Sequence, residues 1–189
     1  NSYPFVDYLI CKFKINIGSA KKSTISDWVL SLNKENQEVF LKYFFDTESS
    51  VNKMGWSISL CQVNQNNQNI ISAMLNNFDI NHRFNTQVRK NKKNTEYYLT
   101  ISGKENLQKF LQRIGLSDEE KVLKIKNHIN KTKGRTFLTK FNKDYLNILF
   151  DKIKDISKVE YNDYLVDLVV PKYHNFFAGY GGILCHNTT

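Results

Sequence analysis

The central feature of the chain is a regular alternation of helix-like and strand-like segments between residues 35 and 114. Three segments repeat apolar residues at helical spacing, and the segments between them alternate polar and apolar residues with the period of two of a strand. This order predicts an α+β domain with the sequence helix, two strands, helix, two strands, helix. The helices are expected at 35–46, 69–78 and 105–114, and the strands at 51–53, 56–63, 81–88 and 95–102.

Residues at the ends of these segments support the assignment. Asn33 stands at the N-cap position of the first helix, where its side chain can accept a hydrogen bond from a free backbone N–H. Gly115 follows the third helix, at the position where a left-handed residue often ends a helix. The first helix carries an apolar face made of Phe40, Leu41, Phe44 and Phe45.

The charge of the chain favours a polyanionic partner. Lys and Arg number 27 against 18 Asp and Glu, which gives a formal net charge of +9 and points to nucleic acid. A hydrophobic content of 41% excludes a disordered polar tail. Cys11, Cys61 and Cys185 lack metal-ligand spacing, and their odd number fits a reducing, intracellular compartment. No apolar run reaches the length of a membrane span, so no membrane partner is expected.

The segment 161–189 carries a second pattern, whose chemistry lies in its own backbone. It ends in His186, Asn187 and Thr188 after a glycine-rich turn. The carboxamide nitrogen of Asn187 can attack its own carbonyl carbon, close a succinimide and release the residue that follows. An acid that protonates the departing nitrogen accelerates this step, and His186 is placed for it. Taken alone, a His-Asn-Thr sequence is more often a polar turn.

The stretches VDLVVPKYHNFF and ILCHN followed by Thr resemble the C-terminal splicing region of an intein. The resemblance implies C-terminal strands of a mostly β splicing domain of the Hint type, at 165–170 and 183–185. It implies no cofactor for splicing. The residues that it assigns to splicing are the cyclising Asn187, the penultimate His186, the acyl acceptor Thr188, the assisting His174 and the acidic Asp167.

A second resemblance lies in FLKYFFDTESSV, residues 40–51, which is similar to one copy of the LAGLIDADG motif of DOD-type homing endonucleases. The predicted order of helices and strands is that of one half of this fold, which is often nested in inteins. The resemblance implies double-stranded DNA as the substrate and places Asp46 and Glu48 at the motif's acidic positions. Glu48 falls at the metal position, where Mg²⁺ would be held with waters and the scissile phosphate.

The hairpin tip between the last two predicted strands is strongly basic. The LAGLIDADG sheet straddles the DNA groove, so the resemblance implies that this tip meets phosphates. Outside that fold, such a charge run is usually a solvated turn. The residues assigned to DNA binding are Arg83, Arg89, Lys90, Lys92 and Lys93.

Three departures from the motif leave two interpretations open. Tyr43 replaces a small Gly, Glu48 an Asp, and Ser49 the terminal Gly. The chain is then either a homing endonuclease with altered activity or a catalytically dead DNA-binding LAGLIDADG module.

One motif copy is present where the LAGLIDADG active site needs two, so either the chain dimerises or its first half is missing. The second explanation is favoured, because the nucleophile and Thr-x-x-His block that begin a complete intein do not occur near Asn1. Splicing would therefore need an N-terminal intein fragment or upstream half, together with the exteins of a host protein. The expected organisation is the end of a first endonuclease half at 1–30, the second half at 31–126, a connecting helical segment at 127–160, the splicing region at 161–187, and the C-extein from 188–189.

Overall fold

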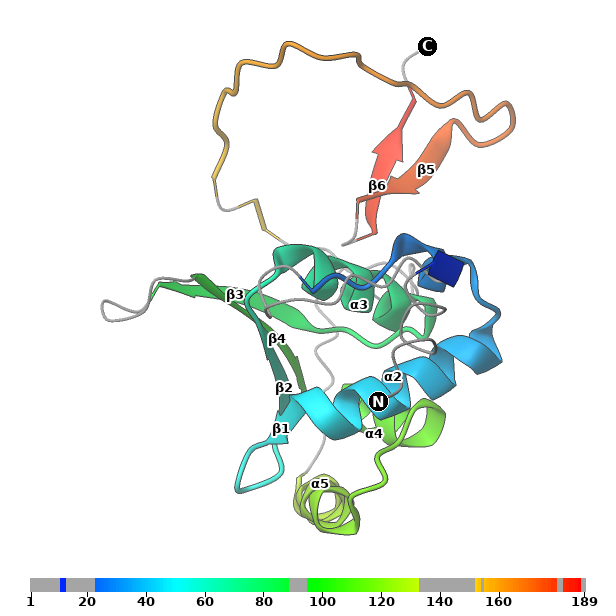
Figure 1. Ribbon diagram of the computed structural model, residues 1–189. Helices are drawn as coiled ribbons and strands as arrows, with labels where there is room; N and C mark the ends of the chain where they lie inside the picture. The colour runs from blue at the N-terminus through cyan, green and yellow to red at the C-terminus, as the bar shows by residue number, and fades with distance from the viewer. Residues whose placement is uncertain are drawn as a thin grey trace.

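The computed structural model describes residues 11–12, 23–88, 95–132, 152–153, 155–179 and 182–187. Figure 1 shows a body of helices packed on one side of a sheet, and a separate hairpin near the C-terminus that a long extended arc precedes. No helix within the described ranges is long and apolar enough to cross a membrane.

Within the described ranges from residue 23 onward, the main body comprises one 3-10 turn, four helices and four strands, and the hairpin adds two more strands. The elements are η1 (Asp27–Ser31), α2 (Lys34–Glu48), β1 (Ser49–Val51), β2 (Ser57–Gln62), α3 (Gln65–Asn77), β3 (Arg83–Val88), β4 (Thr95–Ser102), α4 (Lys104–Arg113), α5 (Glu119–Lys131), β5 (Asn175–Ala178) and β6 (Ile183–His186).

The four strands of the main body form one antiparallel sheet in the order β1-β2-β4-β3. Its central strands place apolar residues opposite one another, with Leu60 beside Leu99 and Ile58 beside Ile101. All four side chains are fully buried. Since side chains of a strand alternate between faces, the other face of the sheet presents the intervening polar residues. The helices α2, α3 and α4 cover the apolar face (Figure 1).

Two aromatic rings join the first and last covering helices at the centre of the core. Phe45 of α2 and Phe110 of α4 are both fully buried, and their ring centroids lie 4.8 Å apart. Each such side chain contributes roughly 1.5–3 kcal/mol through burial. This contact fixes the C-terminal half of α2, which ends at Glu48 where β1 begins.

The sequence predictions for the main body are largely confirmed. The predicted strand at 95–102 matches β4, and Asn33 caps α2 by accepting a hydrogen bond from the amide of Asn36 at 3.0 Å. Helix α3 starts earlier than predicted because its first turns bury polar side chains. Gln68 is fully buried and donates hydrogen bonds to the carbonyls of Leu60 and Tyr97. Hydrophobic periodicity does not detect such a face.

The sequence predictions omit helix α5, although Val122, Ile125 and Ile129 recur along it at helical spacing. A second signal lies in its cap. Asp118 accepts hydrogen bonds from the amides of Glu120 and Lys121, and two further acidic residues occupy the first turn.

Two predictions for the C-terminal third are wrong within the described residues. The segment 165–170 forms no strand, and residues 155–160 form no helix. The side chain of Leu165 is 89% exposed, and the stretch runs as an arc outside the body (Figure 1). Without a neighbouring strand, an apolar run has no partner for its backbone groups. Residues 127–131 of the predicted connecting segment are helical as the end of α5, and residues 152–153 are not helical. Its residues 133–151 and 154 lie outside the described residues. The predicted strand at 183–185 is confirmed as β6.

The turn between β1 and β2 is packed directly against helix α5 at Gly55. Gly55 has φ +71°, and a Cβ atom there would lie 2.1 Å from the carbonyl oxygen of Lys124. We expect Gly55→Ala to lower the free energy of unfolding by roughly 2–4 kcal/mol, from overpacking and backbone strain together. Urea unfolding measures this loss. Gly103→Ala is the control, because Gly103 also has a positive φ of +88°, but a Cβ atom added there would lie 3.9 Å from its nearest neighbour, Nδ2 of Asn106. Equal losses in the two variants would contradict the close contact.

A partly buried histidine is expected to make the fold sensitive to acid. His82 lies with Nδ1 3.0 Å from the carbonyl of Ile80 and Nε2 2.6 Å from the hydroxyl of Ser72. Since a carbonyl only accepts, Nδ1 carries the proton and Nε2 accepts from Ser72. Burial lowers the pKa of His82 from its ordinary value of 6.5, and the hydrogen bond to Ile80 partly opposes the shift.

We therefore expect stability to be full above pH 6.5 and to be lost as the pH falls from there through the lowered folded pKa, because the unfolded chain binds the proton more readily. Urea midpoints between pH 8 and pH 5 test this. His82→Gln removes the titrating group, so its midpoint should fall less over the same range. An equally steep fall in that variant would assign the acid sensitivity to other groups.

Candidate functional sites

The β5–β6 hairpin brings three of the predicted splicing residues, His174, His186 and Asn187, together at one end. Strands β5 and β6 pair Asn175 with His186, and the amide of Asn187 donates to the carbonyl of His174 at 2.9 Å. At the other end, the amide of Gly182 donates to the carbonyl of Gly179 at 3.1 Å and closes the turn. Residues that stand a dozen positions apart in the sequence therefore meet across one hairpin.

The imidazole of His186 lies at the carbonyl group of Asn187. Its Nδ1 is 2.6 Å from the Asn187 carbonyl oxygen, and since that oxygen only accepts, Nδ1–H is the donor. This carbonyl belongs to the peptide bond that precedes Thr188, which itself lies outside the described residues. The contact polarises the carbonyl. The predicted role of His186, protonation of the leaving nitrogen, stays a prediction.

Asn187 is itself buried, with 7% of its surface exposed. Among the residues that the structure describes, none is a hydrogen-bond partner for the buried side-chain oxygen Oδ1 of Asn187. A buried amide that lacks a partner costs free energy, and such groups often mark functional positions. The rings of His174 and His186 stack beside it with centroids 6.1 Å apart and an interplanar angle of 22°.

Asp167 lies in the exposed extended stretch that precedes the hairpin. Its carboxylate accepts a hydrogen bond from the amide of Leu168 at 2.9 Å. The assignment of Asp167 to acyl transfer stays a prediction.

The two acidic residues at the foot of α2 point to different partners. Asp46 accepts a hydrogen bond from the amide of Ser117 at 2.7 Å, and Glu48 accepts one from Gln62 Nε2 at 3.0 Å. Within the part of the chain that the structure describes, no three or more His, Cys, Asp or Glu side chains are placed to hold a metal ion. Glu48 is exposed, and its carboxylate suits one ligand position of a metal ion. The carboxylate of Asp46 is hydrogen-bonded to the loop before α5.

Lys121 is a further residue at the foot of α2. Its Nζ donates to the carbonyl of Ser49 at 3.2 Å, lies 3.5 Å from the carbonyl of Asp46, and pairs weakly with Asp118 at 3.9 Å. A cation beside the last carbonyls of a helix is favourable. These contacts span more than 70 residues of sequence, so no local pattern predicts them.

The face of the main sheet that the helices leave uncovered is polar. Ser59 pairs with Thr100, their hydroxyl oxygens lie 3.2 Å apart, and Arg83 lies beside Thr100 on the edge strand β3. All residues of β3 are exposed. Arg83 is thus exposed at the edge of a polar face of the sheet. The other residues assigned to DNA binding, Arg89, Lys90, Lys92 and Lys93, lie outside the described residues.

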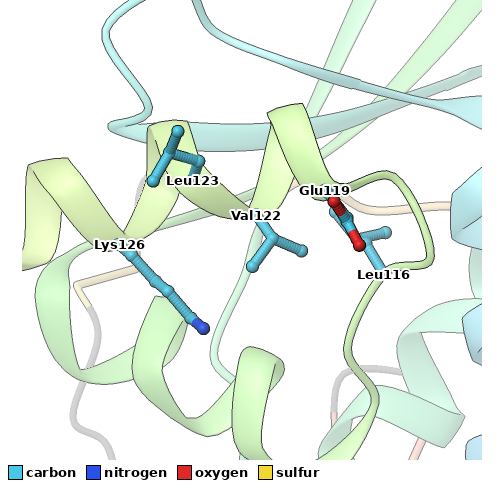
Figure 2. A pocket seen from close by; sticks show the side chains of 5 residues that line it. All are labelled: Leu116, Glu119, Val122, Leu123 and Lys126. Atoms are coloured by element: carbon cyan, nitrogen blue, oxygen red, sulfur yellow. The ribbon is translucent and has the colours of Figure 1, made fainter.

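A small cavity of about 330 Å³ opens along α5 (Figure 2). Glu119, Val122 and Lys126 project into it, with Leu116 at its end and Leu123 directed away from the others. None of the predicted site residues lines it.

Residues 35–115 match the family model of the LAGLIDADG-like domain. The match begins in α2 and ends just after α4, and it includes the whole four-stranded sheet. Mixed helices and antiparallel strands fit such a domain. The match supports a homing endonuclease domain in this part of the chain.

Three proteins with different names are similar to this chain. Transcription initiation factor IIB of Methanocaldococcus jannaschii is 36% identical over 92 residues, which cover 48% of this chain. Replication factor C small subunit of Thermococcus kodakarensis is 26% identical over 151 residues, or 78% of the chain. DNA polymerase of Thermococcus sp. strain GE8 is 26% identical over 192 residues, or 96% of the chain. The chain spans 13%, 16% and 10% of these relatives.

Proposed function

We propose that this chain is the C-terminal part of an intein that cleaves its C-terminal junction by cyclisation of Asn187 and carries a nested LAGLIDADG endonuclease domain. The splicing part of this proposal rests on the contact between His186 Nδ1 and the carbonyl oxygen of buried Asn187. It places a hydrogen-bond donor where negative charge develops when that carbonyl is attacked.

The pattern of relatives supports this proposal. The matches to the polymerase and to the replication factor must overlap, because together they cover more than the whole chain. Proteins with different names therefore share one segment that is a small fraction of each. An element inserted into unrelated hosts has this distribution, and the polymerase match is consistent with an intein.

The reaction proceeds on the backbone of the chain. Nδ2 of Asn187 forms a bond to its own carbonyl carbon and loses a proton, while the bond from that carbon to the nitrogen of Thr188 breaks and the nitrogen gains a proton. The Nδ1–H of His186 stabilises the tetrahedral oxyanion between these events. His174 assists, and in the complete system the hydroxyl of Thr188 has already accepted the N-extein acyl group. An acyl shift to the freed amine then restores a peptide bond.

The exposed stretch 155–170 gives the proposed partner a place to bind. Leu165, Val166 and Val169 are each more than 80% exposed, so apolar side chains occur on both faces of a potential strand. A strand that is apolar on both faces is typical of a sheet interior. We infer that an N-terminal intein fragment or upstream half supplies neighbouring strands, and that Asp167 reaches the junction when the stretch is paired.

For the endonuclease domain, we propose that the open polar face of the main sheet binds double-stranded DNA. Arg83 and the basic tip at 89–93 would contact phosphates, in line with the net charge of +9. Glu48 would hold a Mg²⁺ ion, which would activate a water for attack on the phosphate. The second candidate function is DNA binding without cleavage, which the orientation of Asp46 toward Ser117 favours.

Removal of the cyclising side chain tests the splicing half. The chain is fused after Thr189 to a small reporter, and intact mass is followed with and without a candidate N-terminal fragment. Wild type should release the reporter and leave a C-terminal succinimide, and Asn187→Ala should release none. His186→Ala should slow release about 100-fold, the effect of losing one oxyanion donor. Release from Asn187→Ala at the wild-type rate would refute cyclisation.

Replacing the carboxylate of Glu48, at the foot of α2, by a neutral amide tests DNA cleavage separately from DNA binding. With a genuine target duplex, Glu48→Gln should lose Mg²⁺-dependent strand scission and keep salt-dependent binding, because the carboxylate is a metal ligand and not a phosphate contact. Glu35→Gln is the matched control, an exposed carboxylate at the other end of α2. Binding by the wild type without scission would establish the DNA-binding module instead.

A further inference from the structure

His174 has an unusual backbone conformation. Its φ is +54°, and Asp79 is the only other non-glycine residue with positive φ among the described residues. In this left-handed region the Cβ atom of an L-residue crowds the following carbonyl. Such a conformation persists where the surrounding structure holds it, and it occurs often at functional sites.

Two backbone hydrogen bonds hold His174 in place. Its amide donates to the carbonyl of Val170 at 3.0 Å, and its own carbonyl accepts from the amide of Asn187 at 2.9 Å. The first bond closes the turn at 170–174, and the second adds Asn187 to the ladder of the β5–β6 hairpin. Because the turn reverses the chain at His174, the carbonyl of this residue points toward Asn187.

We propose that His174 positions the scissile residue through its main chain, in addition to any role of its imidazole. The left-handed turn fixes the amide of Asn187, and thereby the carbonyl of Asn187 against Nδ1 of His186. The predicted effect on cleavage rests on the proposed splicing function. The hydrogen bond from the amide of Asn187 to the carbonyl of His174 does not depend on that function. His174 is on this account a positioning residue.

The proposal distinguishes residues by backbone preference and not by side-chain chemistry. Glycine adopts positive φ without strain, and asparagine is the side chain that tolerates it best. Alanine lacks both the imidazole and the preference. His174→Gly and His174→Asn should therefore keep the turn, and His174→Ala should open it. If the imidazole alone mattered, all three variants would behave alike.

The first test measures the hydrogen bond itself. Amide exchange at position 187 is followed by NMR in the full chain carrying Asn187→Ala, which cannot cyclise but keeps the backbone donor. We expect protection to fall about tenfold or more with His174→Ala and to stay within about threefold with His174→Gly or His174→Asn. Tyr173→Ala is the matched control, an exposed neighbour with negative φ, and should leave protection unchanged. Equal loss in the glycine and alanine variants would overturn the proposal.

The second test measures cleavage with Asn187 restored and the reporter attached. We expect release to slow about tenfold more with His174→Ala than with His174→Gly. Equal slowing, with protection kept only in the glycine variant, would show that the imidazole and not the turn limits the reaction. If the wild type releases no reporter with or without the N-terminal fragment, the proposed splicing function fails, and the exchange experiment still decides whether the turn holds position 187.

Discussion

The contact between α2 and the helix that closes the core, α4, determines where the candidate endonuclease residues lie. Phe45 and Phe110 meet above the apolar face of the sheet, with Leu60 and Leu99 beneath the helices. A helix held at this point can end in only one place relative to β1. Glu48 therefore emerges at the edge of the sheet, beside Gln62 of β2. Its position follows from core packing, although the residue itself is polar and exposed.

Local patterns in the sequence account for most of the main body. Asn33, Gly115 and the alternation in β4 are each interpretable within a few residues, because caps and strand faces are local properties. Helix α5 was missed despite its local cap, and the other failures concern segments that depend on distant residues. The polar start of α3 is stabilised by carbonyls of two strands, and the apolar run at 165–170 lacks a neighbouring strand in the part of the chain that the structure describes.

The same distinction applies to the candidate sites. His186 and Asn187 are adjacent in sequence, so the chemistry expected of them follows from the order of the residues alone. The contacts of Asp46 with Ser117 and of Lys121 with Ser49 join residues more than 70 positions apart, and no local spacing predicts them. The left-handed backbone of His174 is also not evident from its residue type. Histidine is recognised for its imidazole, and here its main chain makes the contact to Asn187.

The two candidate activities therefore differ in how they depend on the fold. The proposed junction at Asn187 is built on one hairpin, with a glycine-rich turn and a backbone ladder that ends at Asn187. The endonuclease site needs α2, the sheet and the α4–α5 loop in register. The departures from the LAGLIDADG motif at Tyr43 and Ser49 affect only the contacts of the endonuclease site. If both proposed activities hold, DNA cleavage can be lost while the junction chemistry remains, because no described contact links the carboxylates of α2 to the hairpin.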